Sequence, residues 1–286
     1  MRGPIIFAVS AGMFGLMAFV VKIASAGVGG AQIAVIRFAV GVLPFLLIPS
    51  VRRQSLEWQR FDLLVYRGFF GGLAVLCYFS AIPHVPVGIA TLLNYTTPLF
   101  SGVYAAIFAG ERIRARVVVP LAVAFFGVVL VVRGNAAMSD SPFGGWELLA
   151  LASAVFAGAA VTAIRMARRT ESSWSIFTSF CIFGLVATLP FGLWSWTWPT
   201  AFEWVLLVLV GLLGLVGQIL MTHAFRWVPT LTAGVISQVA VPVSMALGIF
   251  FLGERLTLTM LAGAALTLAG IVSVMLVSAR GYVKEQ

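Results

Sequence analysis

Charge is the scarcest property of this sequence, because Asp, Glu, Lys and Arg together make up only 9% of its 286 residues. Soluble domains carry about a quarter of their residues as charged side chains, which cover the surface that faces water. Here apolar residues make up 61% of the chain, and the mean hydropathy is +1.08. These values exclude a soluble globular fold and predict an all-α protein embedded in a lipid bilayer.

Cysteine and histidine are almost absent, with two residues of each type. Cys77 and Cys181 both fall within apolar runs, which fits neither a disulfide framework nor the Cys/His spacing of a metal site. The sequence also has no paired acids, Ser/His dyad or cluster of metal ligands at the depth of an intramembrane active site. We therefore expect no metal, no other cofactor and no enzymatic activity.

Long apolar runs are what the sequence does contain. A helix needs about 20 residues to cross the hydrocarbon core of a bilayer, and shorter runs can cross when they are flanked by polar turns. Ten such runs can be counted, so we predict ten transmembrane helices. They are Pro4–Ala26, Gln32–Pro49, Phe61–Ile82, Val87–Ala109, Val117–Val132, Leu148–Ile164, Ser173–Trp194, Trp204–Phe225, Leu231–Leu252 and Leu258–Ser278.

Basic residues gather at one side of these spans. With the N-terminus inside, fourteen Lys and Arg residues, Arg67 among them, fall at cytoplasmic ends and loops, whereas Lys22, Arg37, Arg133 and Arg255 fall outside. Because basic residues accumulate on the cytoplasmic side, this bias predicts that both termini are cytoplasmic. The same distribution of basic residues explains the net charge of +9, so this charge does not indicate a nucleic-acid partner, and we expect none.

The sequence aligns with itself at an offset of 143 residues. This offset pairs Pro86 with Pro229, Gly127 with Gly270, and Gly110-Glu111-Arg112 with Gly253-Glu254-Arg255. We predict a single membrane domain, residues 1–286, composed of one repeat at 1–135 and a second at 146–286. Since each repeat has an odd number of spans, the second repeat starts on the opposite side of the membrane, and the repeats are inverted. Inverted repeats allow a site at the membrane midplane to face each side in turn.

A set of motifs in this order resembles the drug/metabolite transporter superfamily, in its ten-span EamA-type branch. The motifs are the two half-repeats, Ile36-Arg37-Phe38 in the second span, and the proline-containing fourth and ninth spans that end in Gly-Glu-Arg. The resemblance covers the whole chain. It implies a carrier in the bacterial inner membrane, most similar to amino-acid exporters, with a cavity between the third, fourth, eighth and ninth spans.

Other interpretations remain open within this architecture. The substrate could belong to another class, such as nucleotides, S-adenosylmethionine or drugs, and the protein could be a channel. A channel would favour a continuous polar lining, whereas this sequence has a short central polar belt. We expect a monomer that binds a small-molecule substrate. Phe180 stands at the second-repeat position of Arg37, so a symmetric role for this arginine is not expected.

Polar residues inside the spans concentrate in the third, fourth, eighth and ninth, and such residues usually face the protein interior. From them we predict a substrate site composed of Tyr78, Asn94, Tyr95, Gln218, Thr222, His223 and Gln238. Pro98 and Pro242 are predicted to break their spans near the middle and to free backbone carbonyls for a ligand. The competing interpretation is that these polar groups form hydrogen bonds between helices.

Ionisable residues are predicted at span ends. Lys22 and Arg37 are expected to extend toward the outer interface. The alternative for Arg37, which lies a turn or more inside its span, is that an outward cavity uses it to attract a carboxylate, and we favour it less. Glu254 is expected to pair with the adjacent Arg255. Proton-coupled carriers commonly place a carboxylate within the membrane, and this sequence has none in mid-span. Transport without a proton gradient is therefore expected. His223 is the residue that could couple transport to protons instead, because the unperturbed pKa of histidine lies near neutrality.

Overall fold

The computed structural model describes residues 2–56, 58–109, 115–136, 144–224, 227–228 and 230–282. All the regular elements in these ranges are helices, which confirms the predicted all-α class. The helices are α1 (Arg2–Ala24), α2 (Gly30–Leu47), α3 (Pro49–Ser55), α4 (Phe61–Ala81), α5 (Val87–Asn94), α6 (Thr97–Ala109), α7 (Ala115–Ala136), α8 (Gly145–Ala167), α9 (Ser173–Trp194), α10 (Ala201–Ala224), α11 (Thr230–Ser237), α12 (Ala240–Leu252) and α13 (Leu258–Tyr282).

Nine helical segments among the described residues are long and apolar enough to cross a bilayer. Large apolar side chains lie exposed along them, such as Leu47 on α2 and Phe250 on α12, as expected of surfaces that face lipid. The predicted fourth span, Val87–Ala109, is not one of the nine and is divided between α5 and α6. The protein is thus a multi-pass membrane protein.

Both proline-containing spans are interrupted at equivalent places. The first interruption falls at Tyr95 and Thr96, between α5 and α6, and the second at Gln238 and Val239, between α11 and α12. Pro98 then lies in the first turn of α6, where a missing backbone N–H costs no helical hydrogen bond. Two short helices replace each predicted kinked span.

The helix bounds repeat at the same offset of 143 residues as the sequence. Thus α1 corresponds to α8, α2 to α9, α5 to α11 and α6 to α12. Helices of the two halves also pack against one another, with α1 along α10, α4 along α8 and α9, and α7 along α13. Neither half buries its apolar surface alone, because the largest core cluster takes residues from both.

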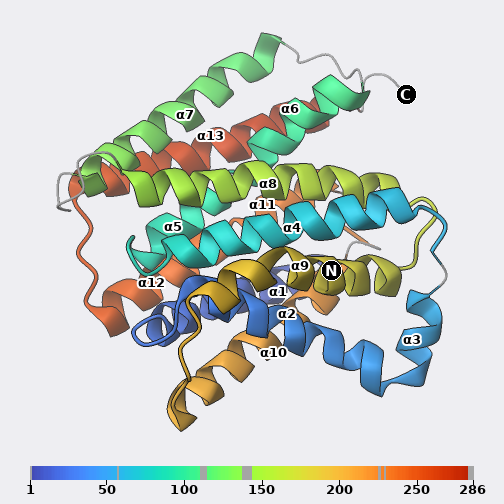
Figure 1. The fold of residues 1–286 in the computed structure, drawn as a ribbon. Coiled ribbons are helices and arrows are strands. Elements are labelled where there is room, and N and C mark those ends of the chain that lie inside the picture. Colours follow the sequence, from blue (N-terminus) through green and yellow to red (C-terminus); the bar gives the residue numbers. More distant parts are fainter. Residues whose placement is uncertain are drawn as a thin grey trace.

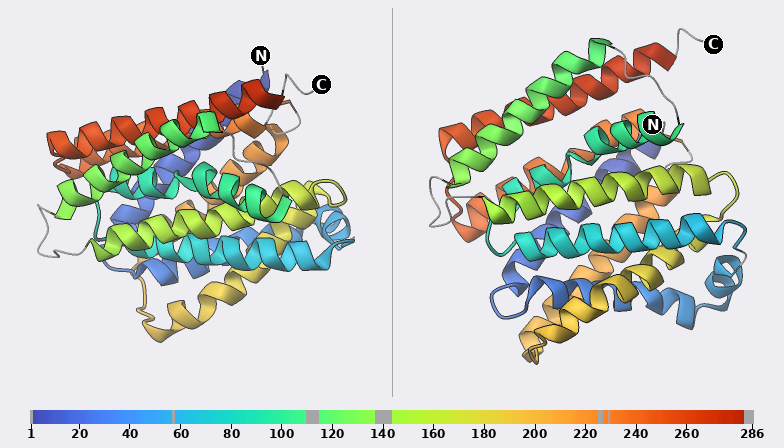
Figure 2. Two further views of the ribbon diagram at one scale, coloured as in Figure 1. Left: turned by 90° about the horizontal axis from the view of Figure 1, so that it is seen from above. Right: turned by 45° about the horizontal axis from the view of Figure 1, so that its top comes forward.

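The bundle has two distinct ends (Figures 1 and 2). The pair α7 and α13 forms one edge, and α10 lies at the opposite edge. The start of α1 and the end of α13 lie toward the end that carries α3 and the connection from α8 to α9. We call this the α3 end. The connections from α4 to α5 and from α12 to α13 lie at the other end.

Candidate functional site

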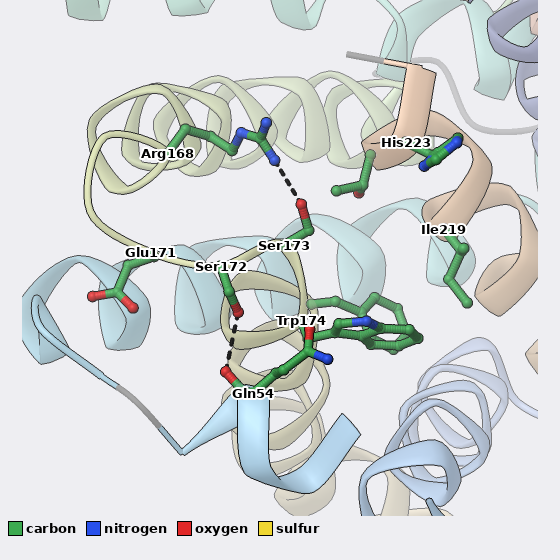
Figure 3. A pocket seen from close by; sticks show the side chains of 10 residues that line it. Gln54, Arg168, Glu171, Ser172, Ser173, Trp174, Ile219 and His223 are labelled. Carbon is green, nitrogen blue, oxygen red and sulfur yellow. Dashed lines mark hydrogen bonds between the residues drawn. The ribbon is translucent and has the colours of Figure 1, made fainter. Parts of the chain in front are cut away.

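A cavity of about 410 Å³ opens at the α3 end of the bundle (Figure 3). Helices α9 and α10 supply most of its wall, and α3 and the α8–α9 connection supply its rim. The lining residues are Gln54, Arg168, Glu171, Ser172, Ser173, Trp174, Phe177, Ile219, Thr222 and His223. The volume is within the range of small-molecule sites in proteins.

Hydrogen bonds fix the rim of this cavity. Arg168 Nη1 donates to Ser173 Oγ over 2.7 Å, and Ser172 Oγ donates to the Gln54 carbonyl over 3.1 Å (Figure 3). Ser172 Oγ also accepts from the Ser175 backbone N–H and so caps the N-terminus of α9. Part of the cavity wall is apolar or aromatic, since Trp174 and Phe177 of α9 and Ile219 of α10 also line it.

The opposite end of the bundle is sealed by Lys22 and Glu254. Lys22 Nζ donates to the carbonyls of Ile82, Pro83 and Val85, at 2.8, 3.1 and 2.9 Å, and so holds the α4–α5 connection against the end of α1. Lys22 Nζ also lies 3.8 Å from Glu254 Oε1. Three carbonyls and one carboxylate satisfy this ammonium group in place of water.

Glu254 completes the seal from the α12–α13 connection. Its two carboxylate oxygens accept from the Val87 backbone N–H, each over 2.9 Å, and so cap the N-terminus of α5. Burial raises the pKa of the Glu254 carboxyl above its usual range, while the Val87 N–H and Lys22 act in the opposite direction. The predicted pairing with Arg255 is wrong, because Lys22 provides the charge that the carboxylate meets. Lys22 likewise does not extend to the interface as predicted.

An aromatic pair covers the outside of this seal. The His84 ring stacks on Trp146 at the start of α8, with centroids 3.7 Å apart and planes 13° apart. Partial burial and then the charge of Lys22 lower the pKa of His84 below its ordinary value, so this histidine is neutral at pH 7. A neutral imidazole can stack on the indole without the cost of desolvating a charge.

The predicted site residues divide into two groups in the structure. Thr222 and His223 line the cavity, and Gln218 lies one helical turn deeper on α10. The other four make hydrogen bonds between chain segments: Tyr78 Oη with Thr91 Oγ1 at 2.7 Å, Asn94 Nδ2 to Ser153 Oγ at 2.7 Å, and Gln238 Nε2 to the Tyr95 carbonyl at 3.2 Å.

The bond between Gln238 and Tyr95 joins the two interruptions. These residues are equivalent under the offset of 143, so the broken spans meet at matching positions. The Tyr95 carbonyl lies at the break between α5 and α6, where the Leu99 N–H donates to the Thr96 carbonyl and so leaves the Tyr95 carbonyl available. In this structure the Gln238 side chain of the other repeat donates to that carbonyl.

Two arginines lie deep in the bundle where sequence reasoning does not place them. Arg37, in the middle of α2, is only 7% exposed and does not extend to the interface as predicted. Arg67, predicted at a cytoplasmic span end, lies in the second turn of α4 and is 6% exposed. Hydropathy alone could not predict that these arginines are buried, because the hydropathy of an apolar run is the same whether its single arginine faces lipid or protein.

Aromatic rings are the groups that these arginines contact. The Arg37 guanidinium carbon lies 5.1 Å from the Phe38 ring centroid and 5.3 Å from that of Phe180, and Arg67 lies 4.0 Å from Phe180. A cation–π contact contributes about 0.5–2 kcal/mol. Taking an ion out of water costs several kcal/mol even in relaxed protein interiors, so these contacts offset only part of the cost.

The described residues include no group of three His, Cys, Asp or Glu side chains arranged to hold a metal ion. The cavity itself is lined by hydroxyl, amide, imidazole and guanidinium groups and by the Glu171 carboxylate, with aromatic walls. Such groups orient a polar metabolite by hydrogen bonds and charge.

Comparison with known proteins places the chain among membrane transporters. The sequence matches the EamA-like transporter family over residues 1–133 and again over residues 144–276. It is 34% identical over 214 residues to the pseudopaline exporter CntI of Pseudomonas aeruginosa (strain UCBPP-PA14), with 74% of each chain covered. It is 28% identical over 293 residues to the threonine/homoserine exporter RhtA of Escherichia coli (strain K12), covering 90% of this chain and 86% of that one.

The fold is also similar to that of a protein of known crystal structure. The two superpose with a TM-score of 0.64 at 21% sequence identity, and the match covers 96% of this chain and 97% of the other.

Proposed function

We propose that this chain, which belongs to the EamA-like transporter family and is a membrane transporter rather than an enzyme, exports small polar metabolites across the bacterial inner membrane. Amino acids are the substrate class that we favour, because the relative matched over 90% of this chain is a threonine/homoserine exporter. The mechanism that we propose is alternating access to a cavity between two inverted repeats.

One observation carries this proposal: the bundle is open at one end and sealed at the other. The cavity at the α3 end admits a small molecule between α9 and α10, while Lys22 and Glu254 close the far end. A channel in a conducting state would be open at both ends. A carrier in one of its two states should have this asymmetry.

The repeat supports a second state in which the ends exchange roles. Under the offset of 143, Lys22 corresponds to Arg165 and Glu254 to Glu111, so the sequence places the same charge types near the α3 end; Glu111 lies outside the described residues. At the sealed end α5 packs against α12, and the equivalent helices α11 and α6 make no comparable contact among the described residues. The two ends of the bundle thus differ in how their helices pack, while the sequence gives them the same charge types.

Filling the cavity should abolish transport. Thr222→Trp places a large side chain where α10 faces Trp174 and Phe177, and we expect counterflow of labelled threonine into proteoliposomes to fall at least about tenfold, because the variant loses the volume that the substrate occupies. The assay is performed without a pH difference, since no proton coupling is expected.

The matched control is Leu212→Trp, on the exposed face of the same helix. We expect this control to retain counterflow, because its new side chain faces lipid. If wild-type protein moves none of threonine, homoserine and glutamate, the proposed amino-acid substrates are wrong. If Thr222→Trp transports as well as the control, the cavity is not the route.

The proposed topology has ten spans with both termini in the cytoplasm. Reporter fusions after Arg52 and Gln286 should have cytoplasmic activity, and a fusion after Asp140 should have external activity, because five spans separate the first residue from this connection. Asp140 and Gln286 lie outside the described residues. A cytoplasmic signal at Asp140 would contradict both the span count and the inverted repeats.

A further inference from the structure

Arg37 and Arg67 are two buried positive charges for which the described residues provide no negative partner. Neither guanidinium has a hydrogen bond or an ion pair with a described residue, and both Nε atoms are buried without an acceptor. The five described carboxylates all have partners elsewhere. Asp62 pairs with Arg60, Glu147 accepts from the Asn135 side chain, and Glu171, Glu203 and Glu254 accept from backbone N–H groups. Native proteins rarely bury one cation in this way, and two together need an explanation.

The two charges are adjacent. Both guanidinium groups lie against the Phe180 ring, at 5.3 Å for Arg37 and 4.0 Å for Arg67, measured from guanidinium carbon to ring centroid. Two like charges held near one ring repel each other, and an arrangement that brings them together favours any ligand that neutralises both.

Space for the two guanidinium groups is made by glycines that are equivalent in the two repeats. A Cβ atom on Gly214 would lie 2.9 Å from Arg37 Nε, and a Cβ on Gly71 would collide with Arg67 Nη1. The positions differ by 143 residues, so the same pair of repeat positions accommodates both cations. Both arginines belong to the first repeat, and each is held in a fitted place beside a glycine, Gly71 of the first repeat for Arg67 and Gly214 of the second for Arg37.

Arg37 borders a small space that shares a lining residue with the large cavity. A small space of about 10 Å³ beside Arg37 is lined by Phe177, Phe180 and Gln218. Phe177 also lines the large cavity, and Thr222 of that cavity lies one turn from Gln218 on α10. Phe177 thus lies between the open cavity and the space beside Arg37.

We propose that Arg37 and Arg67 bind carboxylate groups of the transported metabolite, and that the substrate is an anion with two carboxylates, such as an acidic amino acid or a dicarboxylate derivative of one. This inference rests on the proposed transport function. Guanidinium groups bind carboxylates through paired N–H donors, and the free Nε atoms supply such donors here. The substrate brings the negative charge that the protein lacks, so the loaded site is more stable than the empty one.

The test is thermal unfolding of the purified protein in lipid nanodiscs with three probes of matched shape: succinate, succinamate and succinamide. These carry two, one and no negative charges. We expect succinate to raise the unfolding temperature by several degrees, succinamate to raise it less, and succinamide to leave it unchanged, at equal ionic strength. A response of equal size to all three probes would overturn the proposal.

Arg37→Met and Arg67→Met separate ligand binding from a structural role. Without added anion, each variant should unfold at the wild-type temperature or above it, because each loses an unpaired buried charge. Each should also lose most of the response to succinate. If the arginines serve structure alone, both variants will unfold at lower temperature and the wild type will not respond to succinate. Arg53→Gln, on the exposed face of α3, is the control and should respond like the wild type.

Transport assays distinguish failure of this inference from failure of the proposed function. Counterflow of labelled glutamate that exceeds that of glutamine, and that Arg37→Met abolishes, supports both. Counterflow of threonine with no preference for glutamate over glutamine, and no response to succinate, overturns the anion site alone. Stabilisation by succinate without counterflow of any of these amino acids retains the anion site and overturns the proposed amino-acid export.

Discussion

Removal of the Glu254 carboxylate is expected to open the sealed end of the bundle. Glu254→Ala leaves the Val87 N–H and the Lys22 ammonium without their shared acceptor. Hydrogen bonds that involve a charged group contribute about 1.5–3 kcal/mol. Because about 1.4 kcal/mol is a factor of ten in an equilibrium constant, the open fraction at this end should rise by about ten- to a hundredfold.

Thiol labelling measures this opening. A cysteine introduced by Val85→Cys replaces a fully buried side chain in the connection that Lys22 holds, in a background that carries Cys77→Ala and Cys181→Ala. Its rate of reaction with a water-soluble maleimide in detergent micelles should rise at least about tenfold in Glu254→Ala. Glu254→Gln keeps an acceptor for the Val87 N–H, so its effect should be smaller. The raised pKa of Glu254 agrees with a smaller effect for Glu254→Gln than for Glu254→Ala, because burial already disfavours the charged form that the glutamine lacks.

Glu203→Ala is the matched control for the labelling experiment. Glu203 also accepts from a backbone N–H, but its partner is Thr200 at the start of α10 rather than a group of the α4–α5 connection. We expect its removal to leave the labelling rate at position 85 unchanged. Equal rates in Glu254→Ala and Glu203→Ala would show that the seal does not depend on the carboxylate.

A side chain at Gly127 is expected to separate α7 from α13 and to destabilise the protein strongly. A Cβ atom at Gly127 would lie 2.5 Å from Thr267 N and 2.6 Å from the Gly263 carbonyl, both backbone atoms of α13. Gly270, its repeat equivalent, is as close to Ala124 of α7. Helices in membranes associate mainly by such close packing of small residues.

Gly127→Leu should therefore destabilise the protein by more than about 3 kcal/mol, at or above the upper end for overpacked cores, because backbone atoms cannot move aside. For a chain of this size the unfolding temperature should fall by on the order of 10 °C in nanodiscs. Gly12→Leu is the control: it makes the same chemical change within α1, where nothing lies within 4 Å of the added Cβ. Similar melting of the two variants would contradict the packing argument.

Several features of the site could be predicted from the sequence because they depend on position along the chain. The interruptions at Tyr95 and Gln238 follow from the prolines and the internal repeat, whereas the hydrogen bond between these two residues is seen only in the structure. Thr222 and His223 line the cavity as predicted residues of the eighth span. Whether Tyr78, Asn94 and Gln238 also bind substrate stays a prediction, since in this structure each makes a hydrogen bond within the bundle.

The sequence by itself determined that this chain is a helical membrane protein, where most of its spans lie, and that its two halves repeat. Hydropathy, proline and self-similarity are properties of the chain read in order, so no neighbour needs to be known. Only the tertiary structure decided the partners of the charged groups. Lys22 meets Glu254 of the other repeat, and Arg37 and Arg67 meet at Phe180, because the rotation of each helix is set by the helices packed around it.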